Sequence, residues 1–173
     1  MEESKYDISI IRPQMTEKDI MLRGQGLSSE KLATIKKGLL ALHTLELMAQ
    51  TIYKFQITSE PSELNQRLIA AMSNEMTHYQ DFQIKLYEYN FRPSVFRAVY
   101  WFIGFLFGYT SRLRGSKAIL KTGIWVETKA VHHYSELLST IEWDDDTRAI
   151  IEKDQADEHG HIETWKKMLE KSS

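Results

Sequence analysis

Apolar residues recur at intervals of three and four along most of the chain, which is the spacing of one face of an α-helix. The clearest run lies within "SSEKLATIKKGLLALHTLELMAQTIYKF". Similar patterns predict a second helix from about residue 61 to 89, a third from about 116 to 141 and a fourth that follows "WDDDT" and ends near residue 169. The sequence therefore predicts an all-α fold built on four long helices.

The breaks between these runs carry ordinary helix-start signals. "TSEPSELNQ" offers Ser59 or Thr58 as an N-cap, with Pro61 in a first-turn position. The aspartates of "WDDDT" can cap the last helix and favour its N-terminus. Only 3 prolines and 8 glycines occur in the chain, so long uninterrupted helices are expected.

One segment, "SVFRAVYWFIGFLFGYTSRLRG", departs from the amphipathic pattern. From Ala98 to Tyr109 it carries no charge, and a helix needs about 20 such residues to cross a bilayer. No acidic residue lies between Phe91 and Val126, where six basic ones occur. We expect residues of about 93–112 either to pack on the bundle or to lie in a membrane interface, where the arginines would meet anionic headgroups.

The first 28 residues are polar, lack a helical period and contain Pro13, Gly24 and Gly26. They are interpreted as an arm or cap, residues 1–28, outside a single domain of residues 29–173. A chain of 173 residues with 42% hydrophobic content is long enough for one substantial core and too short for two.

Composition excludes several classes of function. The net charge of -2 offers no basis for nucleic-acid binding. With no cysteine in the chain, disulfides, thiolate metal sites and a catalytic thiol are excluded, and any metal must use nitrogen and oxygen ligands. The first residues, "MEESKYDISI", lack the features of a secretory or transit peptide, so we expect an intracellular location.

Two stretches, "NEMTHYQDF" and "ADEHGHIETW", place a glutamate three residues before a histidine: Glu75 with His78, and Glu158 with His161. On a helix this spacing lets both side chains reach one ion. Either pair alone is also typical of a solvated helix face, and chance gives about half an occurrence in a chain of this composition.

The order of these pairs strengthens the case for a metal site. Isolated glutamates in "LELMA" and "WVETKAV" precede each pair, with Glu46 29 residues before Glu75 and Glu127 31 residues before Glu158. A di-metal carboxylate bundle uses one glutamate from each of two helices and one Glu-x-x-His from each of the others. We predict that the ligands are Glu46, Glu75, His78, Glu127, Glu158 and His161. Four carboxylates and two imidazoles suit two iron ions, with manganese possible.

Two tyrosines share the ligand faces. Tyr53 follows Glu46 by seven residues and Tyr134 follows Glu127 by seven, so both are expected to border the metal layer, either as core aromatics or with a role in the chemistry. The remaining histidines off this register, His43, His132 and His159, are expected to be structural or solvent-facing.

"ELMAQTIYKFQ", "NEMTHYQDF", "FRPSVFRAVYWFIGFLFGYTSRLRG" and "VETKAVHHY" resemble, in order and spacing, the demethoxyubiquinone hydroxylases of ubiquinone biosynthesis. The resemblance implies a ferritin-like four-helix bundle with an interposed apolar, membrane-interfacial segment. It also implies a di-iron monooxygenase that activates O2 and hydroxylates the ring of a prenylated quinone. His133 and Tyr134 match the family's "HHY" pair, which suggests electron or proton transfer or substrate contact. Thr44-Leu45 replaces the small Ala-Gly pair usual before the first ligand.

The resemblance further implies an external electron donor, a membrane surface as partner and a peripheral place on the inner, cytoplasmic face of the cell membrane. The exposed aromatic segment could instead support a homo-oligomer. Two other functions would use the same six ligands: a rubrerythrin-like peroxidase or oxidase, and a ferritin-like iron-binding protein.

Overall fold

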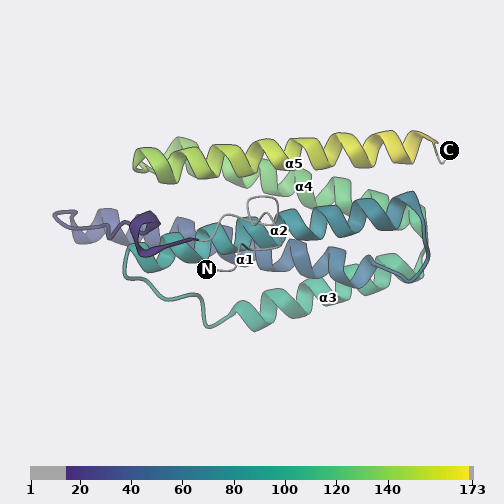
Figure 1. The fold of residues 1–173 in the computed structure, drawn as a ribbon, viewed down its shortest axis with the longest axis horizontal. Helices are drawn as coiled ribbons and strands as arrows, with labels where there is room; N and C mark the ends of the chain where they lie inside the picture. The colour runs from purple at the N-terminus through teal and green to yellow at the C-terminus, as the bar shows by residue number, and fades with distance from the viewer. Residues whose placement is uncertain (1–14, 172–173) are drawn as a thin grey trace, which may run out of the picture.

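The computed structural model describes residues 15–171, and the all-α prediction is confirmed within them. The five α-helices and one 3-10 helix are η2 (Glu17–Asp19), α1 (Ser29–Gln56), α2 (Glu63–Glu88), α3 (Arg97–Leu113), α4 (Ser116–Thr140) and α5 (Asp145–Lys171). The four long helices run along one axis in a ferritin-like bundle, and consecutive helices alternate in direction (Figure 1).

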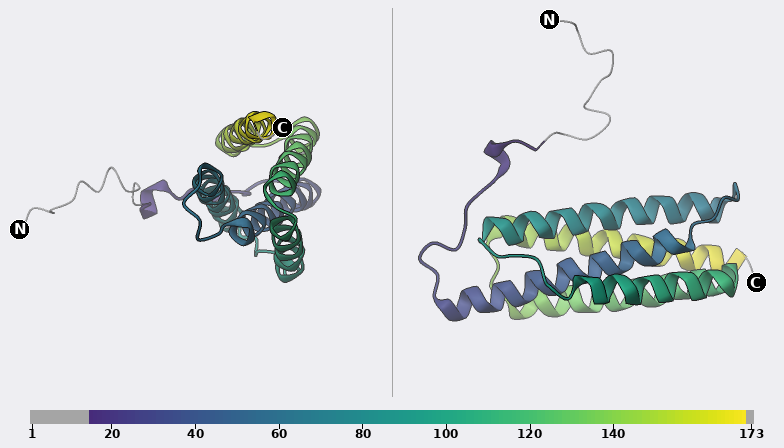
Figure 2. Two further views of the ribbon diagram at one scale, coloured as in Figure 1. Left: turned by 90° about the vertical axis from the view of Figure 1, so that its right-hand side faces the viewer. Right: turned by 90° about the horizontal axis from the view of Figure 1, so that it is seen from below.

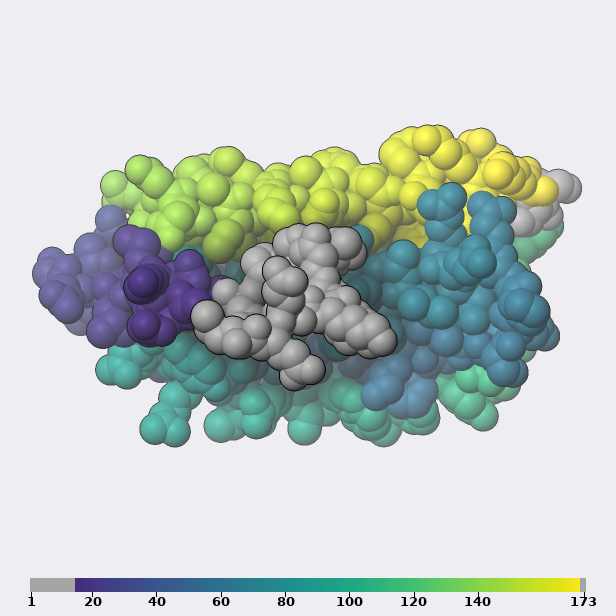
Figure 3. Space-filling view, viewed as in Figure 1, coloured from purple at the N-terminus to yellow at the C-terminus, as the bar shows by residue number. Residues whose placement is uncertain are grey.

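Two helix pairs make up the bundle. The first, α1 with α2, and the second, α4 with α5, are each packed along their length, and α3 lies against α1 with a smaller contact to α4. The end-on view in Figure 2 places α3 at the side of the bundle farthest from α5. In the space-filling view, α5 likewise follows the upper edge of the molecule and α3 the lower one (Figure 3).

The helix starts are set by local hydrogen bonds. Ser62, not Ser59 or Thr58, caps α2, because its hydroxyl accepts from the N–H of Asn65. The backbone of Thr58 is occupied elsewhere, since it donates to and accepts from the Asn65 side chain at 2.8 Å in both cases. The capping role expected of "WDDDT" is confirmed: Asp144 accepts from the N–H of Thr147 at 3.1 Å.

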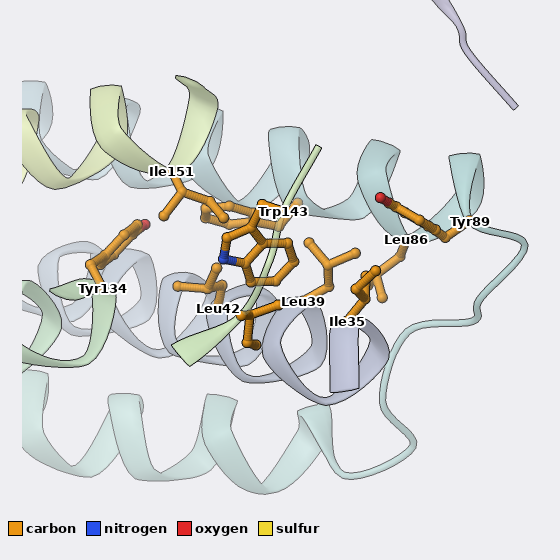
Figure 4. Packing of buried hydrophobic residues seen from close by; sticks show 10 residues of the cluster. Ile35, Leu39, Leu42, Leu86, Tyr89, Tyr134, Trp143 and Ile151 are labelled. Carbon is orange, nitrogen blue, oxygen red and sulfur yellow. The ribbon is translucent and has the colours of Figure 1, made fainter. Parts of the chain in front are cut away.

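Two larger apolar clusters, and a small third one of Ala49, Ile52 and Val126, fill the interior. One lies toward the end of the bundle where α1 begins and consists of Ile35, Leu39, Leu42, Phe82, Leu86, Tyr89, Tyr134, Ile141, Trp143 and Ile151 (Figure 4). The other consists of Tyr53, Leu68, Ala71, Ile119, Leu120 and Trp165. Each fully buried leucine or isoleucine contributes roughly 1.5–3 kcal/mol. The clusters hold the four long helices together on either side of a polar layer.

Small residues bring α3 against α1. A Cβ on Gly104 would lie 2.6 Å from the carbonyl oxygen of Met48, and one on Gly108 would lie 2.5 Å from that of Ile52. Backbone cannot move aside as a flexible side chain can, so these contacts require glycine. The expected packing on the bundle is therefore present, but it uses only the narrow face of α3 that includes Gly104, Gly108 and Ser111.

The other faces of α3 expose large apolar side chains. Its exposed apolar residues, with two that precede the helix, are Val95, Phe96, Val99, Trp101, Phe102, Leu106, Phe107, Tyr109 and Leu113, hereafter the α3 apolar face. Phe107 stacks on the half-exposed Trp125 of α4, with ring centroids 5.4 Å apart. Among the described helices, none is both long and apolar enough to cross a bilayer.

Residues 15–28 are joined to the bundle end through Arg23. Its guanidinium pairs with Glu88 and Asp144 at 2.7 Å each and also contacts Asp146, while its backbone N–H donates to the Glu88 carbonyl. Lys85 adds a second cation 2.7 Å from Glu88. The expected arm thus contacts the bundle over this part, and residues 1–14 lie outside the described residues.

The charge network makes a testable contribution to stability. Burial alone would raise the pKa of Glu88, but Arg23, Lys85 and a backbone N–H hold it below its ordinary value of 4.5. A carboxyl group with a lowered folded-state pKa stabilises the fold fully above the unfolded value, and this contribution is lost as pH falls through the folded value. Glu88→Gln should therefore lower the free energy of unfolding most at neutral pH, and the loss should shrink below about pH 4.5.

Urea unfolding of both chains at several pH values measures this difference. Glu63→Gln is the matched control, because Glu63 is exposed and its only ion pair in the described chain is a 3.7 Å contact with Arg67. A loss for Glu88→Gln that is equal at pH 7 and pH 3 would contradict the assignment.

Candidate metal centre

The six residues predicted as ligands meet in the interior of the bundle. They form two overlapping groups in which one side-chain atom from each member lies within 4.8 Å of the others. One group is Glu46, Glu75, His78 and Glu158, and the other is Glu75, Glu127, Glu158 and His161. Because Glu75 and Glu158 belong to both groups, the arrangement can hold two neighbouring ions with two shared carboxylates.

Each predicted ligand lies on the helix that the sequence predicts. Glu46 lies on α1 and Glu127 on α4, while the two Glu-x-x-His pairs lie on α2 and α5. The three-residue spacing places each pair on one helix face. Relative exposure is 1% or less for all the glutamates and for His78. Only His161, whose side chain is 12% exposed, has part of its surface in solvent.

Both imidazoles turn the same nitrogen toward the carboxylates. The Nδ1 atom of His78 lies 3.1 Å from Glu158, 3.7 Å from Glu46 and 3.8 Å from Glu75. The Nδ1 atom of His161 lies 3.2 Å from Glu75, 3.3 Å from Glu158 and 3.6 Å from Glu127. This convergence gives each group one imidazole nitrogen among three carboxylates.

Several of these buried atoms make no hydrogen bond within the described chain. They are both carboxylate oxygens of Glu75, one oxygen each of Glu127 and Glu158, and Nδ1 of His78. An unpaired buried polar atom is costly, and clusters of them call for water or an ion. Oxygen and imidazole donors at these positions fit the first-row divalent ions that such mixed sites hold.

The electrostatics also favour a cation. Burial and the neighbouring carboxylates Glu158 and Glu127 raise the pKa of Glu75 well above its usual range. Burial likewise raises the pKa of Glu127 to about 8. Burial opposes a charged His161, but the nearby carboxylates of Glu127, Glu158 and Glu75 raise its pKa to about 12. Four carboxyl groups in a dry interior thus require positive charge, from protons or from metal ions.

The two tyrosines connect the halves of the bundle. Tyr134 on α4 donates to Glu46 on α1 at 2.6 Å, and Tyr53 on α1 donates to Glu127 on α4. Both hydroxyls are fully buried, and Trp165 donates to that of Tyr53 at 3.1 Å. Each isolated glutamate is therefore oriented by a tyrosine from the opposite helix, a crossing that sequence spacing alone did not predict.

His133 lies apart from the carboxylates. It lines a cavity of about 410 Å³, together with Tyr100, Trp125 and Lys129. The cavity is also lined by Ala41, Thr44, Leu45, Glu46, Met48, Ala49, Glu75, Val126, Ala130 and His132. Since Trp125 is half exposed and both Glu46 and Glu75 are buried, the cavity connects the surface between α3 and α4 with the metal-ligand layer.

The other histidines are outside the ligand groups. His43 is buried and stacks on Tyr79, with ring centroids 4.2 Å apart, and its Nε2 contacts Gln83. Burial lowers its pKa, which keeps the ring neutral. His132 and His159 are exposed, as expected.

Three side chains behind the imidazoles were not predicted as part of the site. Asp154 and Asp157 face Nε2 of His78, and Asn74 faces Nε2 of His161. Asp154 lies one helical turn before Glu158 on the same face, so the four-residue spacing was an available signal. Asp154 is buried because α5 packs against α2, where His78 lies. The sequence of α5 alone could not show this burial.

Comparison with known proteins gives one consistent result. The family model described as "Ubiquinone biosynthesis protein COQ7" matches residues 34–172. A 3-demethoxyubiquinol 3-hydroxylase of Legionella pneumophila is 27% identical over 124 residues, and one of Pseudomonas putida is 28% identical over 124 residues. A protein of Dictyostelium discoideum named "NADPH-dependent 3-demethoxyubiquinone 3-hydroxylase, mitochondrial" is 29% identical over 125 residues.

These matches cover 69–70% of this chain but only 58% of each relative. The chain thus corresponds to less than two thirds of the length of the curated relatives it matches.

The unpaired atoms of Glu75 predict an unusual effect on stability. Glu75→Gln keeps the shape of the side chain and replaces a carboxyl that must be either buried charged or protonated on folding by a neutral amide, so the metal-free protein should become more stable by about 1–3 kcal/mol at neutral pH. Urea unfolding in the presence of a strong chelator measures the change. Glu163→Gln, at an exposed position on α5, should have an effect near zero. A less stable Glu75→Gln protein would show that the carboxylate is compensated in the metal-free fold.

Proposed function

Since the chain belongs to the family of the ubiquinone biosynthesis protein COQ7, we propose that it is a di-iron monooxygenase that hydroxylates the ring of a prenylated quinone such as demethoxyubiquinone. The observation that carries this proposal is the pair of buried ligand groups sharing Glu75 and Glu158, at the inner end of an apolar cavity.

The ligand set supports two iron ions, with manganese as the other ion of suitable chemistry. In this assignment Glu46 and His78 would help to hold one ion, Glu127 and His161 would help to hold the other, and Glu75 and Glu158 would be shared because they belong to both groups. When bound, the iron pair supplies the redox chemistry that activates O2. One oxygen atom enters a ring C–H bond and the other leaves as water, with two electrons and two protons supplied by an external donor.

The tyrosines orient the carboxylates of this centre. The hydroxyl of Tyr134 donates to one oxygen of Glu46 and leaves the other free to face an ion, and Tyr53 does the same for Glu127. Tyr134 is therefore placed to hold or pass a proton at the Glu46 carboxylate. This contact supports the catalytic role suggested for Tyr134 by the family resemblance.

The cavity suits a substrate with a polar ring and an apolar tail. Its walls are mostly apolar, with Leu45, Met48, Ala49 and Val126 near the buried glutamates. His133 lies on the wall and its Nδ1 is 3.6 Å from Glu136, so its proposed role is contact with the substrate ring or proton transfer near the entrance. The mostly apolar walls would exclude most water from a bound ring.

The α3 apolar face supports collection of the substrate from a lipid bilayer. Tyr100 of the same helix lines the cavity, and arginines flank the helix at both ends. Aromatic and aliphatic side chains can enter the lipid interface while the arginines meet anionic headgroups. We therefore propose peripheral association with a membrane surface, at the inner face of the cell membrane. Self-association through the same face is the alternative use of this surface.

Metal analysis and a turnover assay test the proposal together. The purified chain should bind about two irons. With demethoxyubiquinol, isotopically labelled O2 and a reductant, mass spectrometry should show one labelled oxygen atom in the ring. Glu158→Ala should lose at least one iron and all oxygen insertion, because this carboxylate belongs to both ligand groups.

Glu163→Ala, on the same helix but exposed, should retain both properties. Peroxide consumption without oxygen insertion would replace the hydroxylase assignment with a rubrerythrin-like peroxidase. A large iron-filled shell by size exclusion would replace it with iron storage.

Vesicle binding tests the role of the α3 apolar face. Phe102→Asp combined with Leu106→Asp should reduce binding to vesicles containing phosphatidylglycerol by at least about tenfold, because each apolar side chain contributes roughly 1.5–3 kcal/mol when buried. Co-sedimentation measures the change. Ile69→Asp combined with Tyr87→Asp introduces the same charges on the exposed side of α2 and should leave binding unchanged. No vesicle binding by the unmodified chain would overturn membrane association.

A further inference from the structure

The two imidazoles of the metal centre have different partners on their outer side. The Nε2 atom of His78 lies 3.3 Å from a carboxylate oxygen of Asp157 and 3.6 Å from one of Asp154. The Nε2 atom of His161 lies 3.1 Å from the side-chain amide of Asn74. Two carboxyl groups therefore face Nε2 of His78, and a neutral amide faces Nε2 of His161.

The aspartate pair is partly buried and partly anchored from outside. Asp154 has a relative exposure of 0%, and one of its oxygens makes no hydrogen bond within the described chain. The side chain of Asp157 is 42% exposed. Lys153 bridges the two at 3.0 Å and 3.2 Å, so their positions are fixed relative to each other on α5. The pair therefore places two carboxyl groups next to Nε2 of His78, and Lys153 is a cationic partner of both.

An imidazole that binds a metal through Nδ1 carries its proton on Nε2. For His78 this proton points at the aspartate pair, and a carboxylate acceptor fixes the tautomer and raises the basicity of the ligating nitrogen. In the structure the amide nitrogen of Asn74 faces Nε2 of His161, and a half-turn of this amide would present its oxygen as the corresponding neutral acceptor. Asn74 is exposed, so water competes for the same contact.

We propose that Asp154 and Asp157 are positioning residues for His78, and that the ion held by His78 is consequently bound more tightly than the ion held by His161. Asp157 accepts the hydrogen bond and Asp154 adds a second, buried carboxyl group 3.6 Å from the same nitrogen. The metal centre then fills in order, with the position at Glu46 and His78 first. This inference rests on the proposed di-metal centre and adds to it an inequality between the two positions.

Cobalt(II) binding to the metal-free full chain tests the inference without turnover. Titration in competition with a chelator, followed by visible absorption, should show two steps of different affinity for the unmodified chain. Asp154→Asn combined with Asp157→Asn should weaken the tighter step by about 10–100-fold, which is the usual effect of removing the hydrogen-bond partner of a metal-bound histidine. The weaker step should stay within about threefold of its original affinity.

Further variants separate positioning from a structural role. Asn74→Asp gives His161 a charged acceptor and should strengthen the weaker step, a gain that a merely structural change would not produce. Proton NMR of the cobalt-loaded chain should show two shifted, exchangeable N–H signals, of which the double aspartate variant alters one. Circular dichroism of each metal-free variant checks the fold.

The outcomes distinguish this inference from the function on which it rests. If the unmodified chain binds two ions and the double aspartate variant binds them with unchanged affinities, the positioning role is overturned and the metal centre stands. Two equal steps in the unmodified chain would also overturn the proposed order of filling. If the unmodified chain binds no cobalt, the di-metal centre is overturned and this inference with it.

Discussion

Four carboxyl groups packed together in a dry helical interior are the constraint on which the rest of this structure depends. Glu46, Glu75, Glu127 and Glu158 come from four different helices, and each is 1% exposed or less. Burial of an uncompensated carboxylate opposes folding, so the layer is tolerated because two imidazoles face it, two tyrosines donate to it and divalent ions can complete it. The apolar clusters on either side provide the opposing stabilisation.

This constraint connects stability with function. The buried atoms without a hydrogen bond in the described chain include those of Glu75, Glu127, Glu158 and His78, all predicted ligands, as expected where a site is built at the expense of packing. The cavity reaches the layer from between α1, α3 and α4, because Gly104 and Gly108 hold α3 close to α1 without filling the space beside it. A substrate entering from the α3 side would meet Glu46 and Glu75 first.

The helix pairs α1–α2 and α4–α5 resemble each other but are not identical around the two imidazoles. The two helix pairs repeat the ligands and the crossing tyrosine contacts, but not the residues behind the imidazoles. Aspartates stand behind His78, and an asparagine stands behind His161. A repeated scaffold can thus hold two ions in unlike surroundings, and the difference arises from three side chains outside the ligand set.

The sequence by itself determined the helices and the set of carboxylate and imidazole side chains that share one register. Three- and four-residue spacing is local, so it predicted α1, α2, α4 and α5 closely and placed each Glu-x-x-His pair on one face. The start of α2 was missed because Asn65 occupies Thr58 across the loop. Only the tertiary structure decided which residues meet across helices: Tyr134 with Glu46, Tyr53 with Glu127, and the aspartates of α5 with His78 of α2. All these contacts join residues 74 to 88 positions apart in the sequence. The periodicity within one helix does not specify how its neighbour is rotated, so the sequence pattern could not predict them.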